Sequence, residues 1–300
     1  MNPWFLAFEG LMLLFLGLGL RHAARTGQVF SLLVGVGFGL LLEWATIEQL
    51  QAYRYGRFAL MLGEVPVAIG IGWGLIVYSA RLYSDATDLP EWARPLLDGL
   101  LALGMDLSMD VIAIRLGMWD WGDGLRSEYF GVPWGNFWAW FWVVSSFSAG
   151  LRLCRGRWWA PLAALAIGLV VVGGTNALLV DGIPGPWHPV AVAVEIGAAL
   201  LIVWRLRPRL VREVPWLALA VPLVSHTFFL AAGLLSGAVF EPPVLLALNL
   251  AVFAASLWAH ARLGVRWSKD DDLSHARRVR RQPPGPRVPR GADRSADAGG

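Results

Sequence analysis

The chain has 300 residues, of which 56% are hydrophobic and 16% are charged, and its formal net charge at pH 7 is +3. A soluble domain carries charge on about a quarter of its residues, and here the charges stand in short clusters between long apolar runs. This composition excludes an ordinary soluble domain and predicts an integral membrane protein. It also argues against nucleic-acid binding, because no soluble domain remains to present a basic face.

The predicted elements are nine apolar segments, each close to the roughly 20 residues that a helix needs to cross a bilayer. In chain order they are residues 3–20, 29–47, 65–83, 96–117, 134–151, 158–180, 189–204, 216–235 and 242–263. No Lys or Arg precedes the first segment, and it contains Glu9, so we expect a retained helix rather than a signal peptide. The predicted fold is all-α, a bundle of about nine transmembrane helices over residues 1–266.

The distribution of arginine predicts how this bundle is oriented. Odd-numbered loops between the segments hold most of the arginines, whereas even-numbered loops hold only Arg54, Arg57 and Arg126. Because cytoplasmic loops are enriched in Lys and Arg, we expect the N-terminus outside and the C-terminus in the cytoplasm of a cell inner or plasma membrane. Residues 267–300 are rich in Pro, Gly and Arg, which predicts a disordered basic cytoplasmic tail. Such a tail is suited to contact anionic lipid headgroups.

Ionisable side chains inside the predicted helices point to a functional site, because such groups are costly in a bilayer. Asp106 and Asp110 are four residues apart, so they share one helix face with Cβ atoms about 6 Å apart. Two carboxylates this close in a low dielectric cannot both ionise without a large cost, so one is expected to keep its proton and to be available as a general acid. The structural alternative is that both hydrogen-bond to neighbouring helices, with Arg115 as a partner.

Acidic residues on other segments are expected in the same half of the membrane as this aspartate pair. The predicted orientation places Glu43, Glu64 and Glu195 there, so separate helices bring carboxyl groups to one side. A functional role is favoured for Glu43. Structural roles are expected for three other polar residues of the segments: Glu9, Asp98 and His226.

The segment GMWDWGDGLRSEYFGVPWGNFWAWFW, residues 117–142, is the densest in aromatic and acidic residues. Part of its tryptophan content is expected to form an aromatic belt at the membrane interface. The spacing of Gly131, Pro133 and Asn136 instead predicts a re-entrant turn that leads into a helix. Non-helical backbone at membrane depth persists only against protein or a cavity, so we expect a site at this turn.

Two pairs of sequence blocks carry a resemblance to a known family. The first is MDLSMDVIAIRLGMWDW followed by EYFGVPWGNFWAWF, and the second is GFGLLLEWATIEQLQAYRYG followed by VPVAIGIGWGLIVYSA. Over residues 35–145 the chain resembles the carotenoid hydratase family of membrane proteins, which includes γ-carotene and bisanhydrobacterioruberin hydratases. It departs from the family pattern at Val111, Trp134 and Ala139, and it keeps the acidic positions.

The resemblance implies a lyase of carotenoid biosynthesis that adds water to the terminal double bond of an acyclic carotenoid end group. Asp106, Asp110 and Glu43 are then the catalytic groups, which protonate the alkene and hold the water. Aromatic faces suit the tertiary cation that forms in between. The residues expected to bind the substrate are Trp119, Trp121, Tyr129, Phe130, Asn136, Trp140, Tyr55 and Trp73.

Two other functions use the same residues. A carotenoid end-group cyclase or isomerase ends the same cation by losing a proton, and a membrane transporter or lipid-binding protein uses the carboxylates as a proton relay or cation site. The expected partners are membrane lipid and the acyclic carotenoid substrate. Other enzymes of carotenoid biosynthesis are further candidate partners, and no nucleic acid is expected. No cofactor and no metal are expected, because the single cysteine, Cys154, and the few histidines offer no ligand set.

Overall fold

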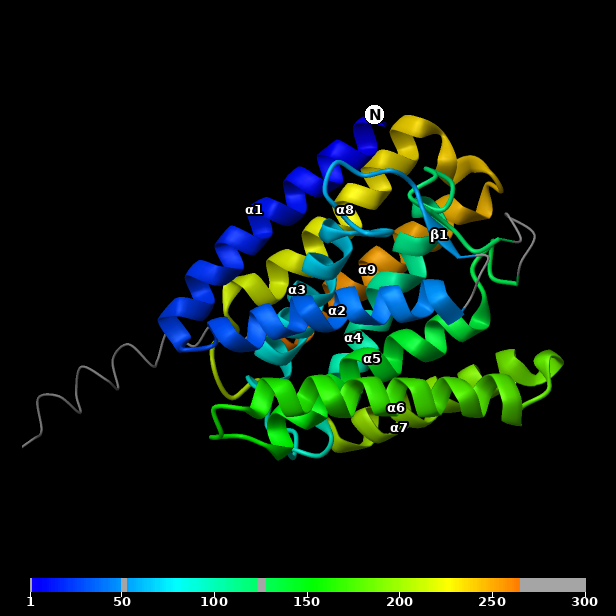
Figure 1. Ribbon diagram of the computed structural model, residues 1–300. Helices are drawn as coiled ribbons and strands as arrows, with labels where there is room; N and C mark the ends of the chain where they lie inside the picture. Colours follow the sequence, from blue (N-terminus) through cyan, green and yellow to red (C-terminus); the bar gives the residue numbers. More distant parts are fainter. Residues whose placement is uncertain (1, 50–52, 123–127, 265–300) are drawn as a thin grey trace, which may run out of the picture. The chain divides into compact units, whose positions relative to one another are not determined.

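The computed structural model describes residues 2–49, 53–122 and 128–264, so the predicted tail lies outside the described residues. Within them the chain forms nine α-helices (Figure 1), and the predicted all-α membrane bundle is confirmed. The helices are α1 Pro3–Thr26, α2 Val29–Gln49, α3 Val67–Ser84, α4 Arg94–Ala113, α5 Trp134–Leu153, α6 Ala160–Gly182, α7 His188–Leu206, α8 Trp216–Ser236 and α9 Val244–Gly264. Six described helices are long and apolar enough to cross a membrane, which indicates a multi-pass membrane protein.

The fourth helix is shorter than its predicted segment, which runs to residue 117. The helix α4 ends at Ala113 because the chain turns at Gly117, whose φ of 73° lies in the left-handed region that glycine adopts most easily. The amide of Met118 then donates to the carbonyl oxygen of Ala113 at 2.9 Å and closes the helix end.

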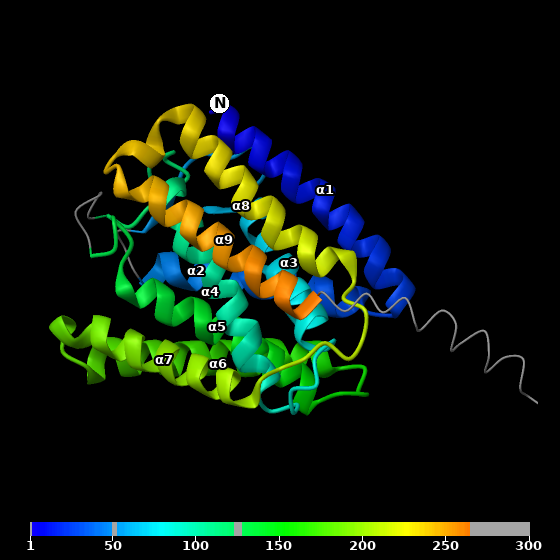
Figure 2. The ribbon, with the colours of Figure 1, turned by 180° about the vertical axis from the view of Figure 1, so that it is seen from behind.

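Burial separates the helices into central and peripheral ones. In the most apolar 18-residue stretch of α3, 78% of the residues are buried. The corresponding share is 22% in α6 and 17% in the segment that includes α7. Figures 1 and 2 show α6 and α7 together along one edge of the bundle and α1 along the opposite edge. Large apolar side chains such as Val170 and Val194 are exposed on these outer helices, as expected of surfaces that face lipid.

Glycines let α2 and α3 pack closely within the chain. The sequence shows Gly35, Gly37 and Gly39 at a spacing of two residues, which permits close helix contact without saying whether it is within or between chains. A Cβ on Gly35 would lie 3.4 Å from the Cα of Gly74 in α3, and a Cβ on Gly39 would lie 2.5 Å from the Cβ of Trp73. Gly35 and Gly39 therefore face α3, whereas a Cβ on Gly37 meets nothing within 4 Å.

We expect Gly74→Ala to destabilise the protein by about 1–3 kcal/mol, the usual cost of overpacking. The added Cβ would lie 2.9 Å from the backbone nitrogen of Val36, which can move only with its helix. Thermal unfolding in detergent measures the loss, with Gly37→Ala as the matched control in open space. Equal melting temperatures for the two variants would show that the α2–α3 contact tolerates extra volume.

Short strands organise the loops at one end of the bundle. Strand β1, Arg54–Tyr55, pairs antiparallel with β4, Trp119–Asp120, so that Tyr55 lies opposite Trp119. Strand β2, Met61–Leu62, pairs with β3, Val65–Pro66, in the same α2–α3 loop. The β1–β4 pair is important because it joins two segments far apart in the sequence.

Glu9 of α1 holds the α2–α3 loop in place. Its carboxylate accepts hydrogen bonds from the backbone amides of Leu60 at 2.8 Å and Ala59 at 3.0 Å. Because the carboxylate is 4% exposed, these amides supply the partners that a buried charge needs. The contact fits the structural role expected of Glu9.

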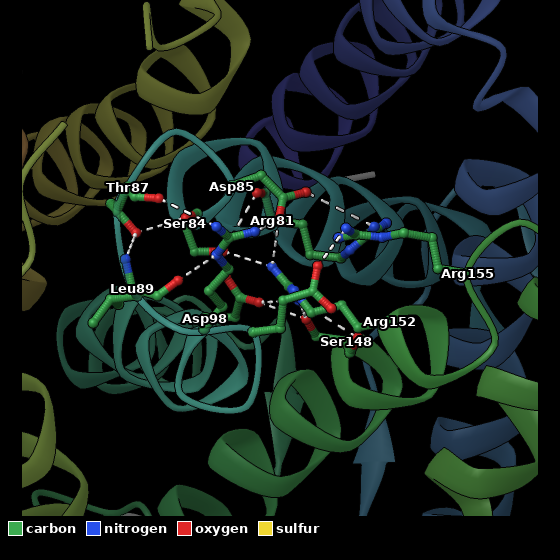
Figure 3. Close-up of polar contacts among 11 residues, drawn as sticks. Arg81, Ser84, Asp85, Thr87, Leu89, Asp98, Ser148, Arg152 and Arg155 are labelled. Atoms are coloured by element: carbon green, nitrogen blue, oxygen red, sulfur yellow. Dashed lines mark hydrogen bonds and ion pairs between the residues drawn. The ribbon is translucent and has the colours of Figure 1, made fainter. Parts of the chain in front are cut away.

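Buried ion pairs tie α3, α4 and α5 together where α4 begins and α5 ends. We call this group the arginine cluster: Arg81, Arg94 and Arg152 around Asp85 and Asp98. The guanidinium of Arg152 lies 2.8 Å from Asp98 and 3.0 Å from Asp85. Figure 3 shows Arg81, Arg152 and the two aspartates pointing toward one another. The side chains of Arg152 and Asp98 are 4% and 0% exposed, so this ion pair is shielded from water, in keeping with the structural role expected of Asp98.

Candidate active site

The side-chain amide of Asn136 on α5 bridges Asp106 and Asp110 of α4. Asn136 donates through Nδ2 to Asp106 Oδ2 at 3.0 Å and to Asp110 Oδ2 at 2.7 Å. The two carboxyl groups also lie within hydrogen-bonding reach of each other. Their exposures are 0% for Asp106, 2% for Asp110 and 8% for Asn136, so the group is closed to bulk water. Among the described residues Asp106 Oδ1 has no hydrogen-bond partner.

A tight turn before α5 sets the position of Asn136. Tyr129 and Val132 exchange two backbone hydrogen bonds, at 3.0 Å and 2.9 Å, around Phe130 and Gly131. Phe130 has a φ of 52°, which is unusual for a bulky residue, and Gly131 has a φ of 100°. Pro133 then caps the helix, and α5 begins at Trp134. The turn predicted from the glycine and proline spacing is present in the described structure.

Arg115 pairs with backbone carbonyls rather than with the aspartates. Its Nη1 donates to the carbonyl oxygens of Val111 at 2.7 Å and Phe130 at 2.8 Å, and its Nε donates to that of Glu241 at 2.9 Å. The guanidinium therefore fastens the tight turn to the end of α4. Among the ion pairs of the described residues none involves Asp106 or Asp110, so Arg115 is not the partner that the structural alternative gave them. The neighbouring helix α5 supplies their hydrogen-bond partner instead, through Asn136.

Glu43 of α2 adds a third buried carboxyl group. Its Oε1 accepts a hydrogen bond from the indole Nε1 of Trp73 at 2.7 Å, and the side chain is 8% exposed. The ring of Trp73 lies 4.3 Å from that of Trp140 on α5, centroid to centroid. Asp110 lies close enough for its charge to interact with that of Glu43. Four helices, α2 to α5, thus contribute carboxyl groups and their donors to one buried region.

Two tyrosines extend this region toward the loops. The hydroxyl groups of Tyr53 and Tyr55 are hydrogen-bonded at 2.8 Å, and both approach the Glu43 carboxyl group closely enough for a side-chain hydrogen bond. The ring of Tyr53 stacks on Trp121 with centroids 4.4 Å apart. Burial, and then the charge of Glu43, raise the pKa of both phenols well above the usual value of 10.0. Both hydroxyl groups therefore keep their protons at physiological pH.

Tyr53 is absent from the residues predicted from the sequence. The signal that indicates it is the pattern Tyr-Arg-Tyr, because residues two apart on an extended strand point to the same side. The structure shows this arrangement, with both hydroxyl groups turned toward Glu43.

A cavity of about 420 Å³ opens beside these tyrosines, between the β1–β4 pair and the end of α4. Three predicted substrate-binding residues line it: Tyr55, Trp119 and Trp121. Arg54 and Asp120 also line it, and they form an exposed ion pair at 3.8 Å. The volume lies at the lower end of the range of about 300–1,000 Å³ that small-molecule sites occupy.

The remaining predicted substrate-binding residues lie away from the lining of this cavity. Trp73 and Trp140 flank Glu43. Tyr129 packs against Phe130 with ring centroids 5.1 Å apart, and burial together with the nearby charge of Asp106 raises the pKa of Tyr129 to about 12. Trp73, Trp140 and Tyr129 therefore lie near the carboxyl groups, and Phe130 packs against Tyr129.

Two of the acidic residues expected on the same side do not join the group. Glu64 is exposed in the turn between β2 and β3. Glu195 of α7 is half-buried beside Trp142, and no hydrogen bond among the described residues links it to the aspartates. The buried region therefore contains Glu43, Asp106 and Asp110 as its acidic members.

Comparisons with known proteins place this chain in a family. The family described as carotenoid biosynthesis protein matches residues 2–200, which include all of the site residues above and extend beyond the predicted region of resemblance. The comparisons with curated proteins and with solved structures found no match. Because the matched region covers most of the chain, the protein belongs to the carotenoid biosynthesis protein family.

Proposed function

We propose that this protein is a hydratase that adds water to the terminal double bond of an acyclic carotenoid end group. The observation that carries the proposal is the buried group of Glu43, Asp106 and Asp110, which forms no ion pair among the described residues and lies beside an aromatic cavity. In a low dielectric three such groups cannot all be charged, so at least one is a proton donor. Membership of the carotenoid biosynthesis family supplies the substrate class.

The proposed reaction needs only acid, water and an aromatic surface. A proton supplied by the carboxyl groups goes to one carbon of the terminal alkene, and the other carbon becomes a tertiary cation. The aromatic faces of Trp119 and Trp121 stabilise this cation. The oxygen of a water molecule then bonds to the cation, and the proton that it releases restores the carboxyl group. One alkene and one water give one tertiary alcohol, with no oxidation or reduction.

The size of the cavity indicates how the substrate is held. A volume of about 420 Å³ suits an end group together with water, rather than a whole carotenoid. We expect the rest of the polyene to lie along the apolar helices. Membrane lipid and the acyclic carotenoid are then the partners, and other enzymes of carotenoid biosynthesis are candidate neighbours. The proposed location is a bacterial-type inner or plasma membrane, with the N-terminus outside, residues 1–266 as the bundle and 267–300 as a cytoplasmic tail.

Expression in a bacterium that accumulates lycopene or γ-carotene tests the proposal. Liquid chromatography with mass detection is expected to show a pigment heavier by one water molecule. Glu195→Gln is the matched control, because it removes a membrane-helix carboxyl group outside the site, and the product is expected to persist. An isomeric pigment of unchanged mass would instead indicate a cyclase or isomerase. Unchanged pigment across several acyclic carotenoids would contradict enzymatic function and favour transport or lipid binding.

A further inference from the structure

The α2–α3 loop connects the cavity to Glu43, one of the three buried acids of the site. Tyr55 lines the cavity, and its hydroxyl group is bonded at 2.8 Å to that of Tyr53. Both hydroxyl groups reach the carboxyl group of Glu43 on α2. Glu43 itself is 8% exposed and lies outside the cavity lining. Tyr55, and not Glu43, is therefore the member of this group that lines the cavity in which a substrate would lie.

We propose that Tyr55 delivers the proton to the substrate and that Glu43 resupplies it, directly or through Tyr53. This inference rests on the proposed hydratase function. It names the group that donates the proton directly to the substrate, because none of the three carboxyl groups lines the cavity. It makes Tyr55 the catalytic residue that touches the substrate. Tyr53 and Glu43 act through it.

The proton transfers balance without any other reactant. As the hydroxyl proton of Tyr55 bonds to the alkene carbon, the phenol oxygen takes a proton from Tyr53 or Glu43. The net result is a Glu43 carboxylate, two neutral phenols and a tertiary cation. When water captures the cation, its released proton returns along the same hydrogen bonds to Glu43.

Two features of the tyrosines favour a relay over packing alone. Their raised pKa keeps both phenols protonated and makes a free phenolate costly, so Tyr55 can give up its proton only as it receives another from Tyr53 or Glu43. The hydroxyl groups also point toward the acid, although the rings pack against Trp119 and Trp121 through their faces and edges. Phenylalanine would provide the same aromatic packing.

Substitution of the hydroxyl groups separates a relay from a binding surface. Purified protein in detergent is incubated with lycopene, and kcat and KM for the hydrated product are measured for wild type, Tyr55→Phe, Tyr53→Phe and the double variant. Tyr78→Phe is the control, because its hydroxyl group bonds to His22 at 2.8 Å and takes no part in the site. Melting temperatures show that each variant is folded.

We expect Tyr55→Phe to lower kcat by about 100-fold, the lower part of the range for general acid catalysis, while KM stays within about twofold. Tyr53→Phe is expected to lower kcat less, because Glu43 also reaches Tyr55 directly. The double variant should be no slower than Tyr55→Phe, because groups that act as one unit are not additive.

A wild-type kcat in Tyr55→Phe, with or without a raised KM, would overturn the relay and leave the hydratase function standing. Hydrated product from the wild type distinguishes this result from failure of the function itself. A folded wild-type protein that forms no hydrated product from lycopene, γ-carotene or other carotenoids with an acyclic end group would overturn both.

Discussion

Asp110→Asn is expected to lower the rate of product formation by at least about 100-fold, because we propose that Asp110 holds the water that captures the cation, and general acid–base groups contribute about 10²–10⁴ to the rate. The substitution keeps the size of the side chain, and an amide oxygen can still accept the hydrogen bond from Asn136 Nδ2, which is 2.7 Å in the wild type. The amide can neither ionise nor give up a proton at physiological pH. The variant is therefore expected to fold and to accumulate unreacted substrate.

Asp106→Asn is expected to have an effect of the same order, because the two carboxyl groups share one donor and lie within hydrogen-bonding reach of each other. Pigment analysis of cells with equal protein levels measures both variants, and Glu195→Gln serves as the control for removal of a carboxyl group from a membrane helix. Wild-type product levels in both aspartate variants would restrict the pair to a structural role and leave the chemistry to Glu43.

Local spacing carried most of what could be predicted about this site. Asp106 and Asp110 of α4 are four residues apart, so their shared face follows from helix geometry alone. The turn before Asn136 follows from Gly131, which adopts a positive φ easily, and from Pro133, which fixes its own φ and restricts the residue before it. Features of this kind depend on residues close together in the chain, so they can be predicted from the sequence alone.

Long-range pairing explains what the sequence left open. Tyr55 meets Trp119 only because β1 and β4 pair across more than sixty residues, and no local pattern specifies that register. Arg115 was a natural partner for the aspartates by charge, yet its guanidinium takes the carbonyl oxygens freed at the turn. A helix end and a left-handed turn both leave carbonyl groups without backbone partners, and these carbonyl groups accept the hydrogen bonds of Arg115 here.

The largest expected loss of stability comes from the arginine cluster. We expect Arg152→Gln to destabilise the protein by about 3–5 kcal/mol, because Asp98 then remains buried without its counter-charge. Arg152 also donates to Ser84 Oγ at 2.7 Å, so the change releases α3 as well as α4. Unfolding by a denaturing detergent, followed by circular dichroism, measures the loss.

Arg155→Gln is the matched control for this change. Arg155 pairs with Glu91, but the two side chains are 52% and 58% exposed, so the pair contributes at most about 1 kcal/mol. The double variant Asp98→Asn with Arg152→Gln is expected to recover part of the loss, because no unpaired charge stays buried. A single variant as stable as Arg155→Gln would mean that water or neighbouring groups already solvate Asp98.

Arg152→Gln and Asp110→Asn are expected to affect different properties, the first the stability of the protein and the second its rate of product formation. Asp98 and Asp110 are twelve residues apart on α4, about 18 Å along the helix axis, so the arginine cluster and the site lie at different depths. Folded Arg152→Gln protein is therefore expected to form product at the wild-type rate per molecule at low temperature, although it unfolds sooner on heating. Asp110→Asn should show the reverse, with near-normal unfolding and almost no product. A loss of rate in folded Arg152→Gln protein would show that the end of α5 controls the position of Asn136, which α5 carries near its start.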